Sequence, residues 1–134
     1  MLDRFFKALV LHGFTWPNPD AWLSIGYYPN PNFFADTNLA YPLIIGITTV
    51  VLLFVIGLFV YGIRYRYPGI VAAGVWIILG GMSNFWDRLK YQHVLDYVGV
   101  AHWPVFNIAD ILIFIGVIWY GVIILRSWKS QGMR

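Results

Sequence analysis

The chain has 134 residues, of which 60% are hydrophobic and only 11% are charged. A water-soluble globule could not bury so much apolar surface, so the composition predicts a single-domain integral membrane protein. The absence of cysteine excludes disulfide bonds and thiolate chemistry. The net charge of +3 comes from scattered Lys and Arg without a basic face, which argues against nucleic acid as a partner.

Residues 1–12 repeat apolar side chains at helical spacing, with Asp3, Arg4 and Lys7 on the opposite face. A helix of this length reaches about 18 Å, which is too short to cross a ~30 Å hydrocarbon core. Periodicity alone therefore favours an amphipathic helix at the membrane surface. The alternative is the outer half of a transmembrane helix whose beginning is absent from the sequence.

Residues 13–42 contain no Lys or Arg and are rich in Pro, Asn, Tyr and Trp. This composition is typical of short strands and turns, so it predicts a small extracytoplasmic β platform lying against the membrane surface. The aromatic side chains of this segment are best interpreted as a belt at the membrane interface.

Three apolar runs are long enough to cross the membrane, and they cover residues 43–63, 68–86 and 105–125. Arg64 and Arg66 follow the first run, and Arg126 follows the third. These basic residues identify the cytoplasmic ends of the helices. The segment between the second and third runs then lies outside, although it contains Arg88 and Lys90.

Asp110 stands near the outer boundary of the third run. It precedes Arg126 by 16 positions, so a helix places it about 24 Å above the cytoplasmic end. Ionisable side chains within membrane segments are usually functional. Burial beside a second carboxylate, for which Asp96 is the obvious partner, would make the pair share one proton. Such a pair meets the electrostatic requirement of an aspartic protease.

The same polar residues also have structural interpretations. Asn107 and Asp110 have the spacing of a helix start, in which Asn caps the helix and Asp complements its dipole. Asp87 can pair with Arg88 or Lys90 in a charge cluster at the surface. A channel or transporter subunit could also use these aspartates, but the spans carry no acidic group at mid-depth.

A metal site is conceivable at His93, Asp96 and His102. No HExxH pair or carboxylate-rich set accompanies them, so the sequence predicts no bound metal.

Three groups of residues form a distinctive pattern of glycines, amides and aspartates. They are Gly80, Gly81, Asn84, Asp87 and Arg88; then Val94, Asp96 and Tyr97; then Phe106, Asn107, Ala109 and Asp110. Their types and spacing resemble the signature of the lipoprotein signal peptidases, also called signal peptidase II. The family's Asp followed four residues later by Lys in the first helix is matched by Asp3 and Lys7, which favours the truncated transmembrane helix.

The resemblance implies an all-α membrane protein, in which a bundle of four transmembrane helices, the first truncated, carries a small extracytoplasmic β subdomain. It implies one peptidase domain over residues 1–134 in the bacterial cytoplasmic membrane, with its active site at the extracytoplasmic face. The implied activity is cleavage of diacylglyceryl-modified prolipoproteins before the lipidated cysteine. Membrane lipid and globomycin-type inhibitors are implied as further partners, and no cofactor is expected.

Carried over to this chain, the resemblance makes Asp96 and Asp110 the catalytic pair. The implied supporting or substrate-binding residues are Asp3, Lys7, Asp36, Asn84, Asp87, Arg88 and Asn107. A truncated relative that binds lipidated peptides without cutting them remains the alternative.

The sequence departs from the family pattern in three respects. The first helix lacks its cytoplasmic half, and the loop between Asp96 and Asp110 is compact. Gln92 stands where the family usually has Gly shortly before the Val-x-Asp element. The family's Asn-x-Gly-x-Ala-Phe element aligns with residues 36–41, which puts Asp36 at the expected Asn, although Asn30 or Asn32 can fill that role in another register.

Overall fold

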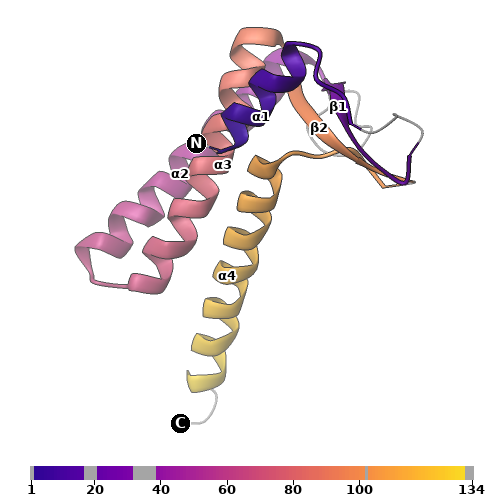
Figure 1. Ribbon diagram of the computed structural model, residues 1–134. Helices are drawn as coiled ribbons and strands as arrows, with labels where there is room; N and C mark the ends of the chain where they lie inside the picture. Colours follow the sequence, from indigo (N-terminus) through magenta and orange to yellow (C-terminus); the bar gives the residue numbers. More distant parts are fainter. Residues whose placement is uncertain (1, 17–20, 32–38, 102, 132–134) are drawn as a thin grey trace.

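The computed structural model describes residues 2–16, 21–31, 39–101 and 103–131. Its elements are, in chain order, α1 (Leu2–Leu11), β1 (Leu23–Asn30), α2 (Tyr41–Arg64), α3 (Pro68–Tyr91), β2 (Val94–Val100) and α4 (Ile108–Gln131). Figure 1 shows α2 and α3 as a hairpin with α4 beside α3, while α1 and the two strands gather at the end opposite the α2–α3 turn. This arrangement confirms the predicted helical membrane fold with a small β subdomain.

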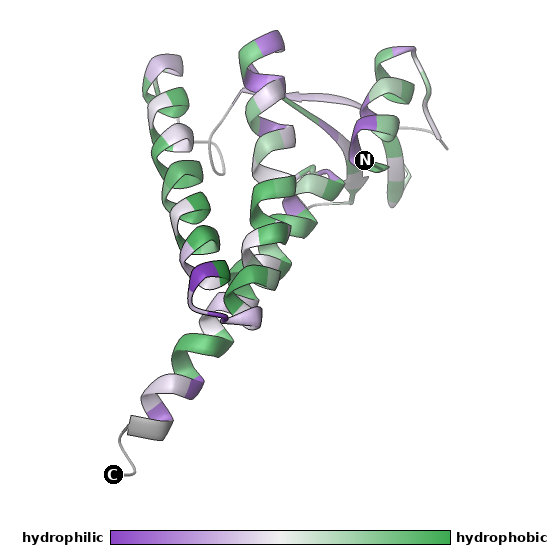
Figure 2. Cartoon of the chain, turned by 90° about the vertical axis from the view of Figure 1, so that its left-hand side faces the viewer, coloured by the Kyte–Doolittle hydropathy of each residue, from purple (hydrophilic) through white to green (hydrophobic). Residues whose placement is uncertain are grey.

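Three of the described helices are long and apolar enough to cross a membrane, and their candidate spans are Tyr41–Arg64, Pro68–Tyr91 and Ile108–Lys129. Hydrophobic residues predominate along much of these helices (Figure 2). Helix α3 continues past the expected end at residue 86, so Arg88 and Lys90 belong to the helix and not to the connection. In its last turns, Asn84, Asp87 and Arg88 have partners inside the protein.

Helix α1 buries its charged face. Asp3 and Lys7 are fully buried, whereas Leu2 and Phe5 are 63% and 58% exposed. A surface helix, which periodicity alone favoured, would turn this face toward water, so the burial of Asp3 and Lys7 argues against it. Arg4 and Lys7 of α1 pair with Asp87 of α3. The apolar face of α1 then points outward, where contact with lipid avoids the cost of exposing apolar side chains to water.

The sheet consists of β1 and β2 in antiparallel register, with Tyr28 opposite Asp96. The platform expected within residues 13–42 thus takes its second strand from outside that range. Asn30 is a diagonal neighbour of Asp96 across the pair, close enough for side chains to interact.

Gln92 ends α3 in the left-handed conformation, with φ of 64°. Its backbone N–H donates to the carbonyl of Arg88 at 2.9 Å, which closes the last helical turn. This conformation favours glycine. The turn into β2 therefore keeps the geometry of a glycine turn even though Gln92 stands there.

Helices α3 and α4 approach closely at Gly80. A Cβ atom at this position would overlap the backbone carbonyl oxygen of Ala109 and would crowd Ile113. Glycine lets the two helix backbones touch, as small residues commonly do between membrane helices. The contact brings the last turns of α3 beside the first turn of α4.

Gly80→Ala should destabilise the protein by about 1–3 kcal/mol, because the added methyl group meets backbone that cannot rotate away. Gly57→Ala is the matched control, since a Cβ at Gly57 has no neighbour within 4 Å. Thermal unfolding in detergent measures both. Equal unfolding midpoints for the two variants would contradict the close α3–α4 contact.

Candidate active site

The predicted polar residues meet where α1, the last turns of α3, β2 and the start of α4 come together. Those brought together are Asp3, Lys7, Asn84, Asp87, Arg88, Asp96, Asn107 and Asp110. All are buried except Asp110, which is half-buried. Asp36 lies outside the described residues.

Asp96 is held by two side-chain amides. Its Oδ1 accepts a hydrogen bond from Asn107 Nδ2 at 2.6 Å, and its Oδ2 accepts one from Asn30 Nδ2 at 2.8 Å. Burial, reinforced by the negative charge of Asp110, raises the pKa of Asp96 to about 6. The two amide hydrogen bonds and the cation Lys7 oppose this rise without cancelling it.

Asp110 and Asn107 cap the start of α4 reciprocally. Asp110 Oδ2 accepts from the backbone N–H of Asn107 at 3.0 Å, and Asn107 Oδ1 accepts from the backbone N–H of Asp110 at 3.0 Å. The helix-start interpretation of the sequence is therefore confirmed. It does not exclude a chemical role, because Asp110 Oδ1 points to Asn84, whose Nδ2 donates to it at 2.7 Å.

Asn84 and Asn107 connect the two aspartates. Asn107 Nδ2 lies within hydrogen-bonding distance of both Asp96 Oδ1 and, at 3.2 Å, Asn84 Oδ1. Asn84 in turn donates to Asp110. The two carboxyl groups therefore belong to one hydrogen-bonded unit, although β2 and α4 supply them separately.

Lys7 holds this unit from the side of α1. Its Nζ lies 3.0 Å from Asp3 Oδ2, 2.7 Å from Asp87 Oδ2 and 2.9 Å from Asn84 Oδ1. An ammonium group has three N–H donors, and each has an acceptor here. Since the cation faces Asn84 Oδ1, the NH₂ end of that amide is turned toward Asp110.

Asp87 has no part in a surface charge cluster. It is fully buried, and it pairs with Lys7 and with Arg4. The expected surface cluster is wrong, because the inward face of α1 brings cations that sequence spacing on α3 could not reveal. The guanidinium of Arg88 lies 3.5 Å from the backbone carbonyl oxygen of Asn84, one turn earlier on the same helix.

Tyr97 and Asn30 also belong to the site. The Tyr97 hydroxyl contacts Asp3 Oδ1 and the backbone N–H of Ile108, each at 3.1 Å. Burial raises the pKa of Tyr97 above its ordinary value, so this hydroxyl stays protonated. The sequence contained a signal for each of them. Tyr97 is the aromatic residue of the family signature that follows Asp96, and Asn30 is one of the two residues that could replace Asp36 at the expected Asn.

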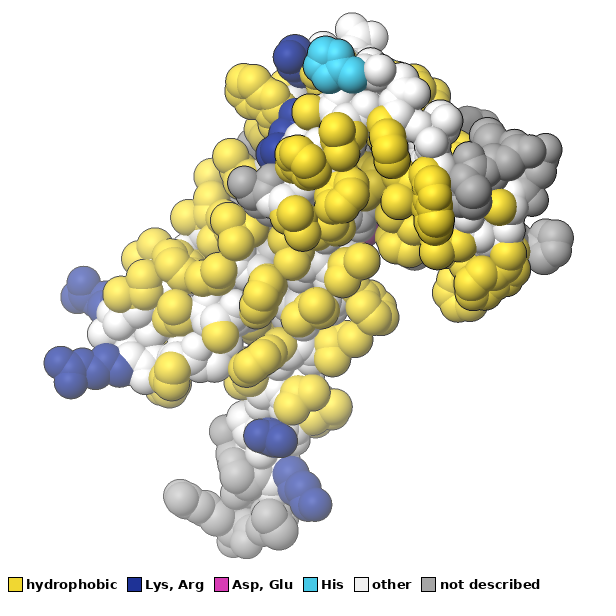
Figure 3. Space-filling view, in the orientation of Figure 1, with side chains coloured by type: hydrophobic (Ala, Val, Ile, Leu, Met, Phe, Trp, Pro, Cys, Tyr) yellow, Lys and Arg dark blue, Asp and Glu magenta, His cyan; other side chains and the backbone are white. Residues whose placement is uncertain are grey.

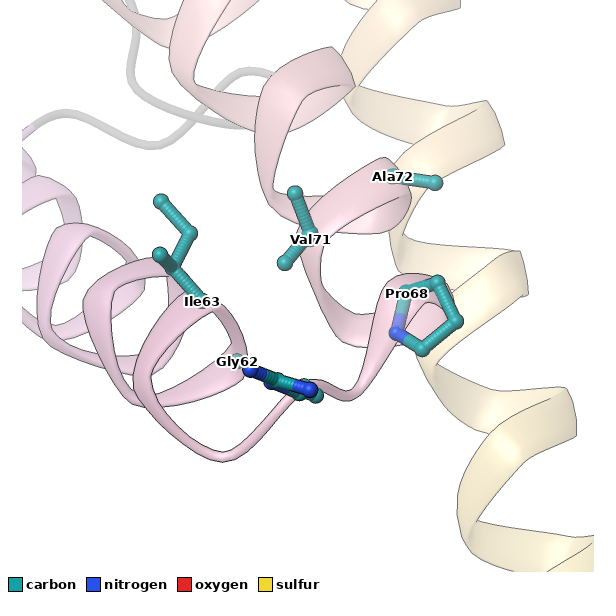
Figure 4. Close-up of a pocket in the computed structure, with 6 residues that line it drawn as sticks. Gly62, Ile63, Pro68, Val71 and Ala72 are labelled. Carbon is teal, nitrogen blue, oxygen red and sulfur yellow. The ribbon is translucent and has the colours of Figure 1, made fainter.

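A shallow groove at the α2–α3 turn lies far from these residues. Its lining is Gly62, Ile63, Arg66, Pro68, Val71 and Ala72 (Figure 4). Lys and Arg side chains are visible at this turn and near the C-terminal end of the chain, and others lie at the opposite end of the molecule beside a histidine (Figure 3). Among the described residues, no group of three or more His or Asp side chains could hold a metal ion.

The family model for signal peptidase (SPase) II matches residues 1–126. The chain belongs to the signal peptidase II family. It is 32% identical to the lipoprotein signal peptidase of Chlorobium phaeobacteroides, over 90% of this chain and 89% of that protein. It is 31% identical to that of Syntrophus aciditrophicus, over 98% of this chain and 89% of that protein.

The fold is also that of a solved membrane enzyme. A bacterial membrane enzyme determined by the in meso method at 1.9 Å resolution superposes with a TM-score of 0.76 and 22% identity, over 92% of this chain and 85% of that one. The predicted family is thus confirmed, and the chain is a multi-pass membrane protein of a lipoprotein-processing protease family.

Lys7→Met should be strongly destabilising, by about 3–5 kcal/mol, because it removes the cation shared by the buried carboxylates of Asp3 and Asp87 and leaves only Arg4 beside Asp87. Lys129→Met removes the same group from an exposed position in α4 and should have little effect. Thermal unfolding in detergent compares the two variants. Similar midpoints would contradict the role of Lys7 as the buried counter-ion.

The stability of the folded protein should also depend on the Asp96 proton. The pKa of Asp96 is raised on folding from 3.8 to about 6, so the folded state binds this proton more tightly than the unfolded chain. The resulting stabilisation is complete below about pH 4 and is lost as the pH rises through about 6.

We therefore expect the unfolding midpoint of the parent to fall between about pH 4 and pH 7, and that of Asp96→Asn to fall less. The slope against pH is the quantity to compare, because the amide introduced by this substitution would lose one hydrogen bond at every pH. Parallel slopes in the two proteins would show that Asp96 titrates normally.

Proposed function

We propose that the chain is an aspartic endopeptidase in which Asp96 and Asp110 are the catalytic pair. The observation that carries this proposal is the linkage of the two carboxyl groups through the amides of Asn84 and Asn107. The charge of Asp110 also raises the pKa of Asp96, as expected for two carboxyl groups that share one proton. Such a pair can act on a peptide bond without a cofactor.

The mechanism requires one protonated and one ionised member of the pair. The ionised carboxylate takes a proton from water while the water oxygen attacks the scissile carbonyl carbon, and the protonated carboxyl donates to the carbonyl oxygen. The tetrahedral intermediate then collapses, the C–N bond breaks, and a proton passes to the leaving amine. Because the two groups are coupled, the shared proton belongs to the pair.

The other polar residues would hold the pair in place. Asn84 and Asn107 orient the carboxyl groups, and Lys7 holds the amide of Asn84 together with Asp3 and Asp87. Arg88 would support this face of α3 or bind substrate. Asp36, outside the described residues, is proposed as a substrate-binding residue.

The proposed substrate is the signal peptide of a diacylglyceryl-modified prolipoprotein, cut before the lipidated cysteine. The names of the relatives support this substrate class. The exposed apolar surface of the helices would let lipid chains reach the site from the membrane. Globomycin-type inhibitors would compete for the same place.

The site is proposed to face the extracytoplasmic side of the bacterial cytoplasmic membrane. Arg64 and Arg66, at the α2–α3 turn, mark the opposite end of the bundle. Positive charge is concentrated on the cytoplasmic side of membrane proteins, which supports this orientation. A single peptidase domain over residues 1–134 is part of the same proposal.

Purified protein should cleave a diacylglyceryl-modified lipobox peptide, and Asp96→Asn and Asp110→Asn should each lower turnover by a factor of about 10³ or more. Each replacement removes the proton exchange on which attack of water depends. Because Asn has nearly the size and shape of Asp, the variants should still bind the peptide. Binding measured with a fluorescent peptide shows that the variants are folded. A parent protein that binds the peptide without cutting it would instead indicate a non-cutting relative.

A further inference from the structure

Tyr97 occupies a junction between the strand of Asp96 and the helix of Asp110. It follows Asp96 directly on β2, and only 1% of it is exposed. Its hydroxyl accepts a hydrogen bond from the backbone N–H of Ile108, the first residue of α4, at 3.1 Å, and donates to Asp3 Oδ1 at 3.1 Å. One hydroxyl thus joins β2, α4 and α1.

Asp3 completes the junction. Its Oδ1 also accepts from the backbone N–H of Ala109 at 3.2 Å, and its Oδ2 accepts from the hydroxyl of Ser83 at 2.6 Å. The first N–H groups of a helix have no partner within the helix. Here Tyr97 and Asp3 bind those of Ile108 and Ala109, immediately before Asp110.

The ring of Tyr97 is fixed independently of its hydroxyl. It stacks on Phe6 of α1, with ring centroids 5.6 Å apart and an interplanar angle of 17°. Removing the hydroxyl therefore keeps the aromatic packing and leaves the N–H of Ile108 without its partner. Even a partly buried N–H is costly to leave without a partner, so the start of α4 would move to find another acceptor.

We propose that Tyr97 is a positioning residue whose hydroxyl sets the separation between Asp96 and Asp110 by tying β2 to the first turn of α4. This inference rests on the proposed function, in which the two aspartates act together. The separation matters for turnover, because small displacements of reacting groups lower rates steeply.

The variant to test is Tyr97→Phe, and Tyr120→Phe is its matched control. The Tyr120 hydroxyl is also buried, but it has no hydrogen-bond partner among the described residues. With the lipobox peptide, Tyr97→Phe should lower kcat by about tenfold or more and leave KM unchanged. Tyr120→Phe should change neither constant.

An infrared titration of the Asp96 carboxyl band provides a readout that does not need activity. Among the described residues, the charged groups near Asp96 are Asp110 on α4, Lys7 on α1 and Arg88 on α3. If Tyr97→Phe lets the aspartates separate, the repulsion from Asp110 weakens and the Asp96 midpoint moves to lower pH. The Tyr120→Phe midpoint should equal that of the parent.

The outcomes separate the two proposals. A parent protein without turnover would overturn the proposed function, whereas the infrared midpoints would still decide the role of Tyr97. A Tyr97→Phe protein with lower thermal stability but unchanged kcat and midpoint would overturn the positioning role. If Tyr97→Phe does not fold, 3-fluorotyrosine at position 97 is the second variant, because it keeps the ring and makes the hydroxyl oxygen a weaker hydrogen-bond acceptor. It should lower kcat at constant KM. An unchanged kcat would overturn the proposal.

Discussion

The ammonium group of Lys7 is fully buried, and both the packing of α1 against α3 and the orientation of the Asn84 amide depend on its charge. Asp3 and Asp87 neutralise it, which turns the charged face of α1 inward against α3. A buried cation without these carboxylates would be far too costly. The same ammonium group has Asn84 Oδ1 as its third partner, so the amide presents its NH₂ group to Asp110. The pairing that anchors α1 thus also orients the proposed catalytic carboxyl group.

Hydropathy was sufficient to predict the long helices, because each apolar run must satisfy its backbone within the membrane. It was not sufficient for α1. A helix with one charged and one apolar face has the same periodicity whether its charged face contacts water or protein. The charged face of α1 points into the protein because its partners lie on α3, and periodicity contains no information about those partners. Nothing in the sequence indicated that the second strand of the sheet would be Val94–Val100, since strand pairing depends on contacts distant in sequence.

The candidate site was predictable to the extent that its residues form a family signature. Asp110 and its partner Asp96 were already indicated by their place near the outer membrane boundary, and the amides Asn84 and Asn107 were added from that pattern. The hydrogen bonds among these four residues agree with both predictions. Local spacing failed for Asp87, whose nearest charges in sequence do not form a surface cluster with it. The contact of Asn30 with Asp96 depends on strand register, which the sequence leaves open.

The proposed mechanism requires that Asp96 and Asp110 form one electrostatic unit. The most direct test is an infrared titration of the Asp96 carboxyl group in the parent protein and in Asp110→Asn, with Asp96→Asn used to assign the band. In the parent the midpoint should lie at about 6, and it should move to lower pH once the negative charge at position 110 is removed. An identical midpoint in both proteins would show that the two carboxyl groups titrate independently and do not act as a pair.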